Sequence, residues 1–344
     1  MLKILYAGSP APAATTLRLL LDGLQAQEGG RSYQIAGVLT NPPSAKGRHK
    51  ELVPTDVGAL AAERGIPVFC PQKLDAAARE QIAAQGFDAL VCFAYGKIFG
   101  PKFLSLFKAG GVNVHPSLLP KYRGATPVPA AILNCDAETG VTVQTLALGM
   151  DEGEILAQEK IALDGTETTD SLLDKSAQIA AALLDGLLQK TAEAASFPKG
   201  KAQEGEPSYT KTISKDDALI NWNDSATKIA AAIRAYTSEP GAWTRIGAES
   251  GETLKILKAA PLDENCSQDQ NAAAPTGQPG AIVQPRAADL PAGTVAAFDK
   301  KRGILIKCGD GLLCVTELQR QQKKAMGYKD FMNGARDFVG TRLF

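Results

Sequence analysis

An asparagine and a histidine, Asn113 and His115, stand two positions apart in an otherwise apolar run. In an extended strand alternate side chains share a face, so both polar groups would point the same way while Val112 and Val114 pack on the other side. An asparagine amide can donate a hydrogen bond to a developing oxyanion, and a histidine can hold or pass a proton near neutral pH. By itself, the pair fits a structural cap of the strand end equally well.

A carboxylate could join this pair from a second position. Asp151 lies in the Gly-flanked acidic turn 149–154, directly after an apolar run that is typical of another strand. Such a turn at a sheet edge could place the Asp151 side chain in the same crevice, although a loop aspartate more often caps a helix or faces solvent. Glu152 and Glu154 are interpreted as ordinary turn residues.

Composition excludes several classes of protein. The chain has 344 residues, of which 44% are hydrophobic and 22% charged, so it has ordinary globular usage and is long enough for two domains. Its six cysteines form no CxxC pair and it has two histidines, so we expect neither a zinc site nor a disulfide framework. The apolar start is too short for a signal peptide or a membrane span, which favours a cytoplasmic protein.

Short apolar runs alternate with helical patterns in the first half, which predicts βαβ units around a parallel sheet. Open α/β sheets bind ligands at the carboxyl ends of their strands, where Asn113 and His115 would lie. We therefore predict a doubly wound, Rossmann-like α/β domain over residues 1–196. Its strands are expected at 3–7, 34–40, 89–94, 111–115 and 141–146, and its helices at 55–64, 76–84 and 171–195.

The composition changes after this domain. Residues 197–212 combine Pro, Gly and charged residues, which predicts a linker. In 213–344, a helix near 225–235 and several short strand-like runs with Gly turns predict a small closed β-barrel. Residues 263–291 are rich in Gln, Asn, Ala and Pro and poor in large apolar side chains, so we predict a disordered surface insertion there.

A longer motif around the polar pair resembles a known family. Asn113-x-His115 is followed by Ser117-Leu118-Leu119-Pro120-x-x-Arg123-Gly124 and, further on, by Asp151. This pattern resembles the signature of the formyltransferases that use 10-formyltetrahydrofolate. The resemblance runs almost end to end and includes segments 4–10, 93–96, 138–142 and 220–222.

The resemblance implies both a reaction and a site. The formyl group of 10-formyltetrahydrofolate would pass to the α-amino group of methionine on initiator Met-tRNA, for translation initiation and without a metal. Asn113 would stabilise the oxyanion, His115 and Asp151 would move protons, and the C-terminal barrel would be of the OB type. Because a single chain can suffice for a one-to-one complex, we expect a monomer.

The resemblance implies folate-binding residues at two strand ends: Ser117, Leu118, Leu119 and Pro120 after one strand, and Phe93, Tyr95 and Gly96 at the other. Backbone amides and carbonyls there can hold a flat, hydrogen-bonding pterin against an apolar wall. The two leucines and the two aromatic residues of this set could supply that wall. A purely structural role in the core fits these four side chains equally well.

Two basic regions are candidates for binding tRNA. The connection 41–50 is longer than most such loops, and the resemblance implies that it enters the acceptor stem with Lys46, Arg48 and Lys50, Arg48 being at a tRNA-reading position. Without the resemblance, an ordinary solvated loop would be preferred. Residues 294–344 hold ten Lys and Arg against five Asp and Glu. This excess favours contact with a nucleic-acid backbone through Lys300, Lys301, Arg302, Lys323 and Lys324.

Three other functions remain open. A formyltransferase for a small amine would share Asn113, His115 and Asp151 but would not need a basic barrel, and a folate hydrolase would send water to the formyl carbon instead. A catalytically silent RNA-binding protein would not need the three polar residues intact. A hydride-transfer enzyme is disfavoured, because residues 8–12 lack the G-x-G-x-x-G pattern that binds a dinucleotide.

Overall fold

The computed structural model describes residues 1–23, 32–46, 51–237, 239–262, 289–335 and 337–344. Arg48, Lys50 and nearly all of the predicted insertion at 263–291 lie outside these described residues. The chain divides into two compact units. Unit 1 comprises Met1–Ala131, Ala137–Leu163 and Ser171–Lys211, and unit 2 comprises Ile132–Asp136, Asp164–Asp170 and Thr212–Phe344.

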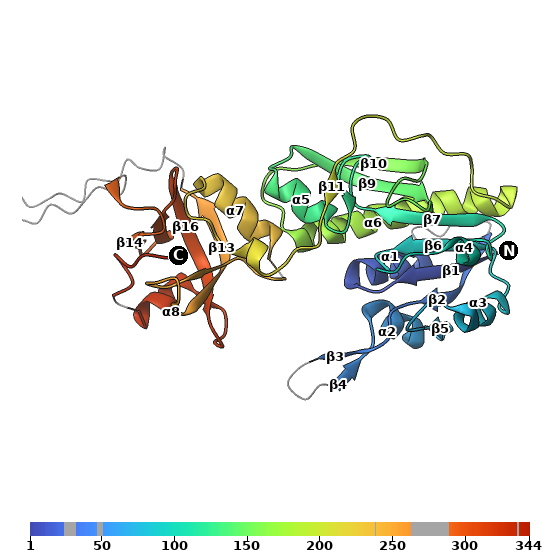
Figure 1. Cartoon of the computed structure of the whole chain (residues 1–344), viewed down its shortest axis with the longest axis horizontal. Helices are drawn as coiled ribbons and strands as arrows, with labels where there is room; N and C mark the ends of the chain where they lie inside the picture. The colour runs from blue at the N-terminus through green and yellow to red at the C-terminus, as the bar shows by residue number, and fades with distance from the viewer. Residues whose placement is uncertain (24–31, 47–50, 238, 263–288, 336) are drawn as a thin grey trace, which may run out of the picture. The chain divides into compact units, whose positions relative to one another are not determined.

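Unit 1 is built on a seven-stranded sheet in the order β10-β9-β7-β6-β1-β2-β5 (Figure 1). Strands β5, β2, β1, β6 and β7 are parallel, whereas β9 runs antiparallel to both β7 and β10. The predicted doubly wound sheet is confirmed in its parallel part, and the run expected as a strand at 141–146 belongs to antiparallel β9. The bounds are Leu2–Gly8 (β1), Tyr33–Leu39 (β2), Val68–Phe69 (β5), Ala89–Phe93 (β6), Gly110–His115 (β7), Glu138–Thr145 (β9) and Ile155–Ala162 (β10).

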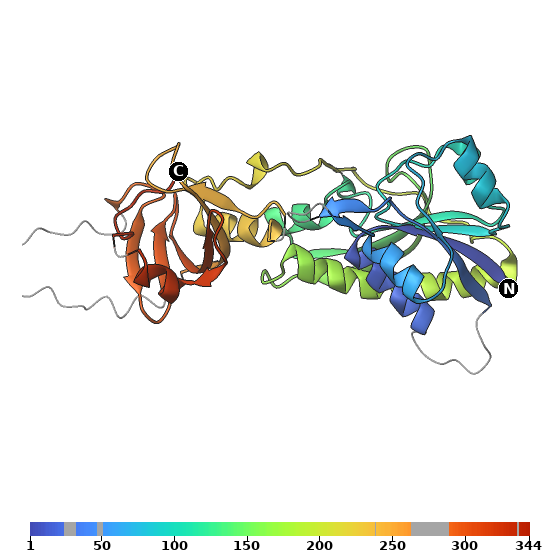
Figure 2. The ribbon, with the colours of Figure 1, turned by 90° about the horizontal axis from the view of Figure 1, so that it is seen from below.

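Helices cover both faces of this sheet (Figure 2). On one face, the hydroxyl of Tyr6 in β1 donates to the carbonyl of Ala13 in α1 at 2.8 Å. On the other face, Leu5 of β1 packs in a buried cluster with Ile82 of α3 and Phe103 of α4. The helices are Ala11–Asp22 (α1), Asp56–Glu63 (α2), Ala76–Ala83 (α3), Pro101–Leu104 (α4), Pro127–Leu133 (α5) and Thr169–Ala194 (α6).

Side-chain caps fix where two of these helices begin. The hydroxyl of Thr55 accepts from the backbone N–H of Gly58 at 3.0 Å, and the carboxylate of Asp75 accepts from that of Ala78 at 3.0 Å. Each cap satisfies one of the N–H groups that a helix leaves unpaired at its start. The helices expected at 55–64, 76–84 and 171–195 are therefore α2, α3 and α6, with small differences at their ends.

Unit 2 contains a six-stranded antiparallel sheet in the order β12-β13-β16-β15-β14, with β17 paired to β16. The last residues close it, because Leu343 bridges to Ile246 beyond β12 while Arg342 bridges to Thr294 before β14. Joining both edges in this way makes the small closed barrel that the sequence predicts. Its elements are Trp243–Arg245 (β12), Thr253–Pro261 (β13), Val295–Asp299 (β14), Gly303–Lys307 (β15), Leu312–Arg320 (β16), Met326–Gly327 (β17), Ala226–Ala235 (α7) and Tyr328–Asn333 (α8).

Residues 197–211 are part of unit 1, in contrast with the linker predicted at 197–212. Within them, Tyr209–Thr210 (β11) pairs in parallel with Arg123–Gly124 (β8). The hydroxyl of Ser208 also accepts from the backbone N–H of Tyr122 at 2.8 Å. A segment of Pro, Gly and polar residues has no periodicity, so the sequence offers no sign of these hydrogen bonds with residues far away in the chain.

Candidate active site

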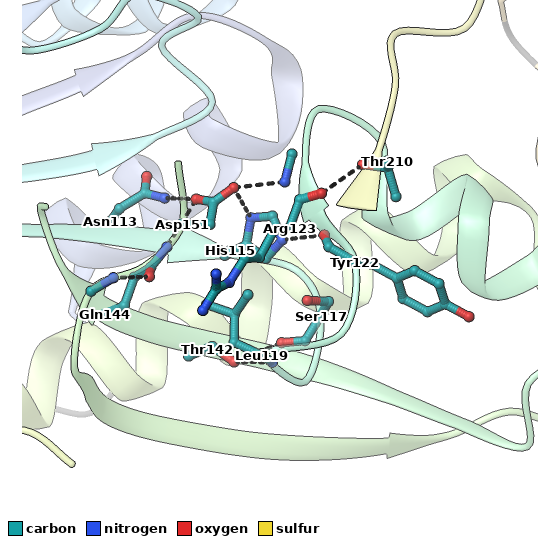
Figure 3. A network of polar contacts seen from close by, with 12 residues as sticks. Asn113, His115, Ser117, Leu119, Tyr122, Arg123, Thr142, Gln144, Asp151 and Thr210 are labelled. Atoms are coloured by element: carbon teal, nitrogen blue, oxygen red, sulfur yellow. Dashed lines mark hydrogen bonds and ion pairs between the residues drawn. The ribbon is translucent and has the colours of Figure 1, made fainter. Parts of the chain in front are cut away.

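The end of β7 presents Asn113 and His115 on the same face, as the alternation of a strand predicts. Both side chains lie against Asp151 (Figure 3), whereas Val112 and Val114 are buried. Asp151 comes from the turn between β9 and β10. The three polar residues singled out in the sequence therefore meet in one place.

The carboxylate of Asp151 is held from several sides. Its Oδ1 accepts from Nδ2 of Asn113 at 3.3 Å and from Nε2 of Gln144 at 2.9 Å. Its Oδ2 accepts from the backbone N–H of Gly124 at 2.8 Å and lies 3.6 Å from Nδ1 of His115. With 13% of its side chain exposed, Asp151 is accessible to a ligand but fixed in orientation.

The hydrogen bond on the far side of His115 sets its tautomer. Nε2 lies 2.8 Å from the carbonyl oxygen of Tyr122, which can only accept, so Nε2 carries the proton. Burial lowers the pKa of His115 below its ordinary value of 6.5, and the charge of Asp151 and the bond to Tyr122 offset this only in part. A neutral ring then turns the lone pair of Nδ1 toward Oδ2 of Asp151, and the two acceptors can share one incoming proton.

A constrained turn carries Asp151. Its φ of +55° is a left-handed conformation that non-glycine residues seldom adopt. Gly153 follows closely, and a Cβ there would stand 1.8 Å from the carbonyl oxygen of Thr145, so no larger residue fits. The backbone N–H of Gly153 donates to Oε1 of Gln144 at 3.1 Å. Gln144 therefore holds both the carboxylate and the backbone of the turn.

These groups can support attack by an external amine. Asn113 offers amide hydrogens to a developing oxyanion, and the pair of His115 and Asp151 offers a place for a proton. The neighbouring thiol of Cys92 is buried in β6, and burial raises its pKa to about 12, so it stays protonated and is no nucleophile near neutral pH. The arrangement is suited to direct transfer of an acyl group from one substrate to the other.

Comparison with known proteins identifies the family. A family model described as formyl transferase matches residues 10–186, and one described as formyl transferase, C-terminal domain matches residues 212–336. A methionyl-tRNA formyltransferase from Treponema denticola is 39% identical over 98% of this chain and 98% of its own length. The chain belongs to the formyl transferase family. A second family member, a methionyl-tRNA formyltransferase from Dictyoglomus thermophilum, is 34% identical over 99% of this chain and 100% of its own length.

Solved structures share the fold of the family at lower identity. An N-formyltransferase from Helicobacter canadensis, in complex with folinic acid and dTDP-3-aminofucose, matches with a TM-score of 0.56 and 17% identity, covering 93% of this chain and 100% of that chain. HypX from Aquifex aeolicus in complex with tetrahydrofolic acid matches with a TM-score of 0.58 and 14% identity, covering 98% of this chain and 48% of that chain. At these identities the likeness concerns the fold alone.

The residues expected to bind folate fall into two groups. Those of the loop after β7 are fixed by hydrogen bonds: the Ser117 hydroxyl donates to the carbonyl of Lys121 at 2.6 Å, and the Thr142 hydroxyl donates to the Ser117 carbonyl at 2.6 Å. In this loop Leu119 is buried, whereas Leu118 and Pro120 are half-buried. The loop therefore has a set shape with part of its apolar surface accessible.

The second group lies at the end of β6 and directly after it, and here the expected apolar wall is only partly present. Phe93 and Tyr95 are 2% and 1% exposed, and the ring of Tyr95 stacks on Phe99 with centroids 5.4 Å apart. Because these side chains complete the core, a ligand at this strand end would meet backbone rather than aromatic rings. Gly96 is exposed with a φ of +81°, and it offers such backbone.

Two glutamines of the site were missed by the sequence reasoning. Gln144 follows Val143 on the same side of β9 as Thr142, and these two polar residues alternate with the buried Val141 and Val143, so the alternation was a usable signal. Gln203 lies in the segment interpreted as a linker, and its Nε2 donates to the carbonyl oxygen of Asp151 at 2.8 Å. No sequence pattern marks Gln203, because only the folded chain brings it beside the turn.

The expected tRNA contacts are located only in part. The connection predicted as a loop at 41–50 contains Ser44–Lys46 (β3), which pairs antiparallel with Glu51–Val53 (β4). The side chain of Lys46, like Arg48 and Lys50, lies outside what the structure describes. In unit 2, Lys300, Lys301 and Arg302 occupy the turn between β14 and β15, and Lys323 and Lys324 occupy the exposed turn between β16 and β17.

The residues that the structure describes contain no group of three or more His, Cys, Asp or Glu side chains placed to hold a metal ion. Within the same ranges, no helix is both long and apolar enough to cross a membrane.

Proposed function

We propose that this chain transfers the formyl group of 10-formyltetrahydrofolate to the α-amino group of methionine on initiator Met-tRNA. The observation that carries the proposal is its identity of 34–39% with methionyl-tRNA formyltransferases along nearly the whole chain, through both family domains. A formyltransferase that acts on a small amine would not be expected to share this sequence identity with methionyl-tRNA formyltransferases over unit 2. We further propose a monomeric, cytoplasmic enzyme, with the domain expected at 1–196, extended by the rest of unit 1 to residue 211, as its catalytic domain and 213–344 as its tRNA-binding domain.

Asn113 is assigned to the oxyanion. When the amine nitrogen attacks the formyl carbon, the carbonyl oxygen gains negative charge in a tetrahedral intermediate. The amide nitrogen of Asn113 carries two hydrogens, and the contact with Asp151 at 3.3 Å uses one of them. The second can bond to the oxyanion, and removing such a donor typically lowers kcat by about 100- to 1000-fold.

His115 and Asp151 are assigned to the proton. The attacking amine must lose one proton, and N10 of the folate must gain one as its bond to the formyl carbon breaks. The proton can enter the 3.6 Å space between Nδ1 of His115 and Oδ2 of Asp151, where two acceptors face each other. The Nε2 bond to Tyr122 keeps the imidazole in the tautomer that makes this possible.

The surface around these groups suits a flat, polar heterocycle. Leu148 and Met150 are 72% and 61% exposed in the turn before Asp151, and Gly96 exposes backbone at the end of β6. Apolar faces with nearby N–H and C=O groups are what pterin recognition requires. We assign the folate to this region, with Ser117, Leu118, Leu119 and Pro120 forming the opposite side.

The basic residues are assigned to the tRNA. Lys46, Arg48 and Lys50 would contact the acceptor end, and the two basic turns of unit 2 would contact phosphates without reading sequence.

An acceptor panel tests the proposal. The purified protein is given 10-formyltetrahydrofolate labelled in the formyl group, together with initiator Met-tRNA, elongator Met-tRNA, free methionine or water alone. Label should appear on initiator Met-tRNA in preference to the other acceptors. Label on free methionine, or release of formate in water at the same rate, would overturn the proposed substrate.

A further inference from the structure

Gln203 connects the acidic turn to the segment that follows α6. Its Nε2 donates to the carbonyl oxygens of Asp151 and Gly153, both at 2.8 Å, and lies 3.3 Å from Oε1 of Gln144. Its Oε1 accepts from Nη2 of Arg123 at 2.8 Å and from Nε of Arg123 at 3.2 Å. A single side chain therefore satisfies two carbonyls of the turn and is itself held by a forked guanidinium.

Arg123 is anchored well enough to hold Gln203 in place. Its side chain is 12% exposed, and Nη1 donates to Oε1 of Glu152 at 3.3 Å and to the hydroxyl of Tyr209 at 3.0 Å. Glu152 belongs to the same turn as Asp151, and Tyr209 to the same segment as Gln203. The guanidinium thus ties the turn and the segment together around the Gln203 amide.

The same segment also sets the other side of the carboxylate. β11 pairs with β8, which aligns Thr210 with Gly124, and the N–H of Gly124 donates to Oδ2 of Asp151 at 2.8 Å. Residues 203–210 therefore constrain the backbone of Asp151 through Gln203 and its side chain through Gly124. Two such constraints are consistent with the left-handed φ of +55° at Asp151, a conformation that persists only where its surroundings enforce it.

We infer that Gln203 is a positioning residue for the reaction, which holds the Asp151 turn so that Oδ2 faces Nδ1 of His115. The inference rests on the proposed function for its main assay. Gln203 is not a proton carrier, because it has no titratable group and both ends of its amide are occupied by the turn and by Arg123. Its effect on turnover passes through Asp151, and a misplacement of about 1 Å at a reacting group can cost about 100-fold in rate.

Two replacement side chains of similar length test the donor end and the acceptor end of the Gln203 amide separately. Gln203→Glu keeps an acceptor for Arg123 but loses both donors to the turn, and Gln203→Met loses donors and acceptor alike. We expect both variants to lower kcat by about 10- to 100-fold, with KM values for folate and Met-tRNA close to wild type. Gln189→Met is the matched control, because Gln189 accepts from the backbone N–H of Ser32 beside the opposite, amino-terminal end of the strands.

The outcomes are distinct. A wild-type kcat in Gln203→Glu would overturn the inference, since the donors to Asp151 and Gly153 would then be dispensable. A raised KM with unchanged kcat would also overturn it, by making Gln203 a substrate contact. If the free energy of unfolding fell together with kcat, the role of Gln203 would be purely structural, and the inference would be wrong.

A measurement without turnover keeps the test independent of the substrate. In a His49→Gln background the one remaining imidazole is that of His115. Its Nδ1 nitrogen-15 chemical shift should change in Gln203→Met, which adds no charge of its own, and not in Gln189→Met, because only the first variant lets the Asp151 charge move. If the acceptor panel fails but this shift changes, the substrate assignment is wrong and the positioning role stands. An unchanged shift would refute the positioning role itself.

Discussion

Asp151→Asn should abolish proton transfer while keeping the size of the side chain. The wild-type carboxylate accepts three hydrogen bonds, from Asn113 at 3.3 Å, Gln144 at 2.9 Å and the N–H of Gly124 at 2.8 Å. An asparagine has one acceptor oxygen in place of two. If that oxygen keeps the bonds to Asn113 and Gln144, its NH₂ group turns toward the N–H of Gly124 and toward Nδ1 of His115.

Two effects of different size follow from this geometry. The new amide would donate to the Nδ1 lone pair of His115, so both the free base and the negative charge that attract the amine proton are lost. Since general acid–base catalysis contributes about 10²- to 10⁴-fold, kcat should fall by a factor in this range. The N–H of Gly124 loses its acceptor, which should lower the free energy of unfolding by about 1–3 kcal/mol.

Three measurements on one pair of variants test this reasoning. Single-turnover formylation with labelled 10-formyltetrahydrofolate reports the chemical step, urea unfolding reports stability, and a direct binding assay reports affinity for Met-tRNA. Glu138→Gln serves as the control, because it removes an exposed carboxylate paired with Lys160 at the far end of β9. Wild-type turnover in Asp151→Asn would refute the proton-transfer assignment. An equal loss of tRNA binding in that variant would also refute it.

Four further predictions concern the active site and the basic regions. Asn113→Ala should lower kcat by about 100- to 1000-fold with little change in the KM for folate, and an equal loss of folate binding would make Asn113 a ligand anchor. Because burial holds the folded pKa of His115 below 6.5, the stability gained over His115→Gln should be complete above pH 6.5 and decline as pH falls below it, as urea unfolding in a pH series can check. Arg48→Ala should reduce formylation of initiator Met-tRNA by more than the loss of one phosphate contact explains. A second variant neutralises the basic turns of unit 2 at Lys300, Lys301, Arg302, Lys323 and Lys324. In a salt series it should bind initiator and elongator tRNA more weakly to the same extent, with a flatter salt dependence of binding. Identical behaviour of the two variants would contradict a positioning role for Arg48.

Features that depend on near neighbours in the chain could be predicted from the sequence. The alternation of side chains along a strand places Asn113 and His115 on one face, and Thr55, as the N-cap residue, starts α2 where expected. Both effects act within a few residues of the chain. The alternation of strand and helix patterns along the chain likewise predicts the parallel part of the sheet. The motif that contains Asp151 also marks this carboxylate without reference to its position in space.

Features that depend on pairing between distant segments required the folded chain. Neither the antiparallel direction of β9 nor the incorporation of 197–211 into unit 1 leaves a periodic signal, since each is set by hydrogen bonds with residues far away in sequence. Phe93 and Tyr95 illustrate the same limit: their aromatic character fits a ligand wall or a core, and only their burial in the folded chain, together with the stack of Tyr95 on Phe99, places them in the core.

The sequence by itself determined which chemical groups are present: an amide, an imidazole and a carboxylate in one recognisable motif. The tertiary structure decided how they act together. It buries His115 so that its ring is neutral, aims Nε2 at the carbonyl of Tyr122, and leaves Nδ1 facing Asp151 at 3.6 Å. It also brings Gln203 to the Asp151 turn from 52 positions along the chain. Protonation states and contacts of this kind follow from burial and three-dimensional proximity, which no local pattern of residues encodes.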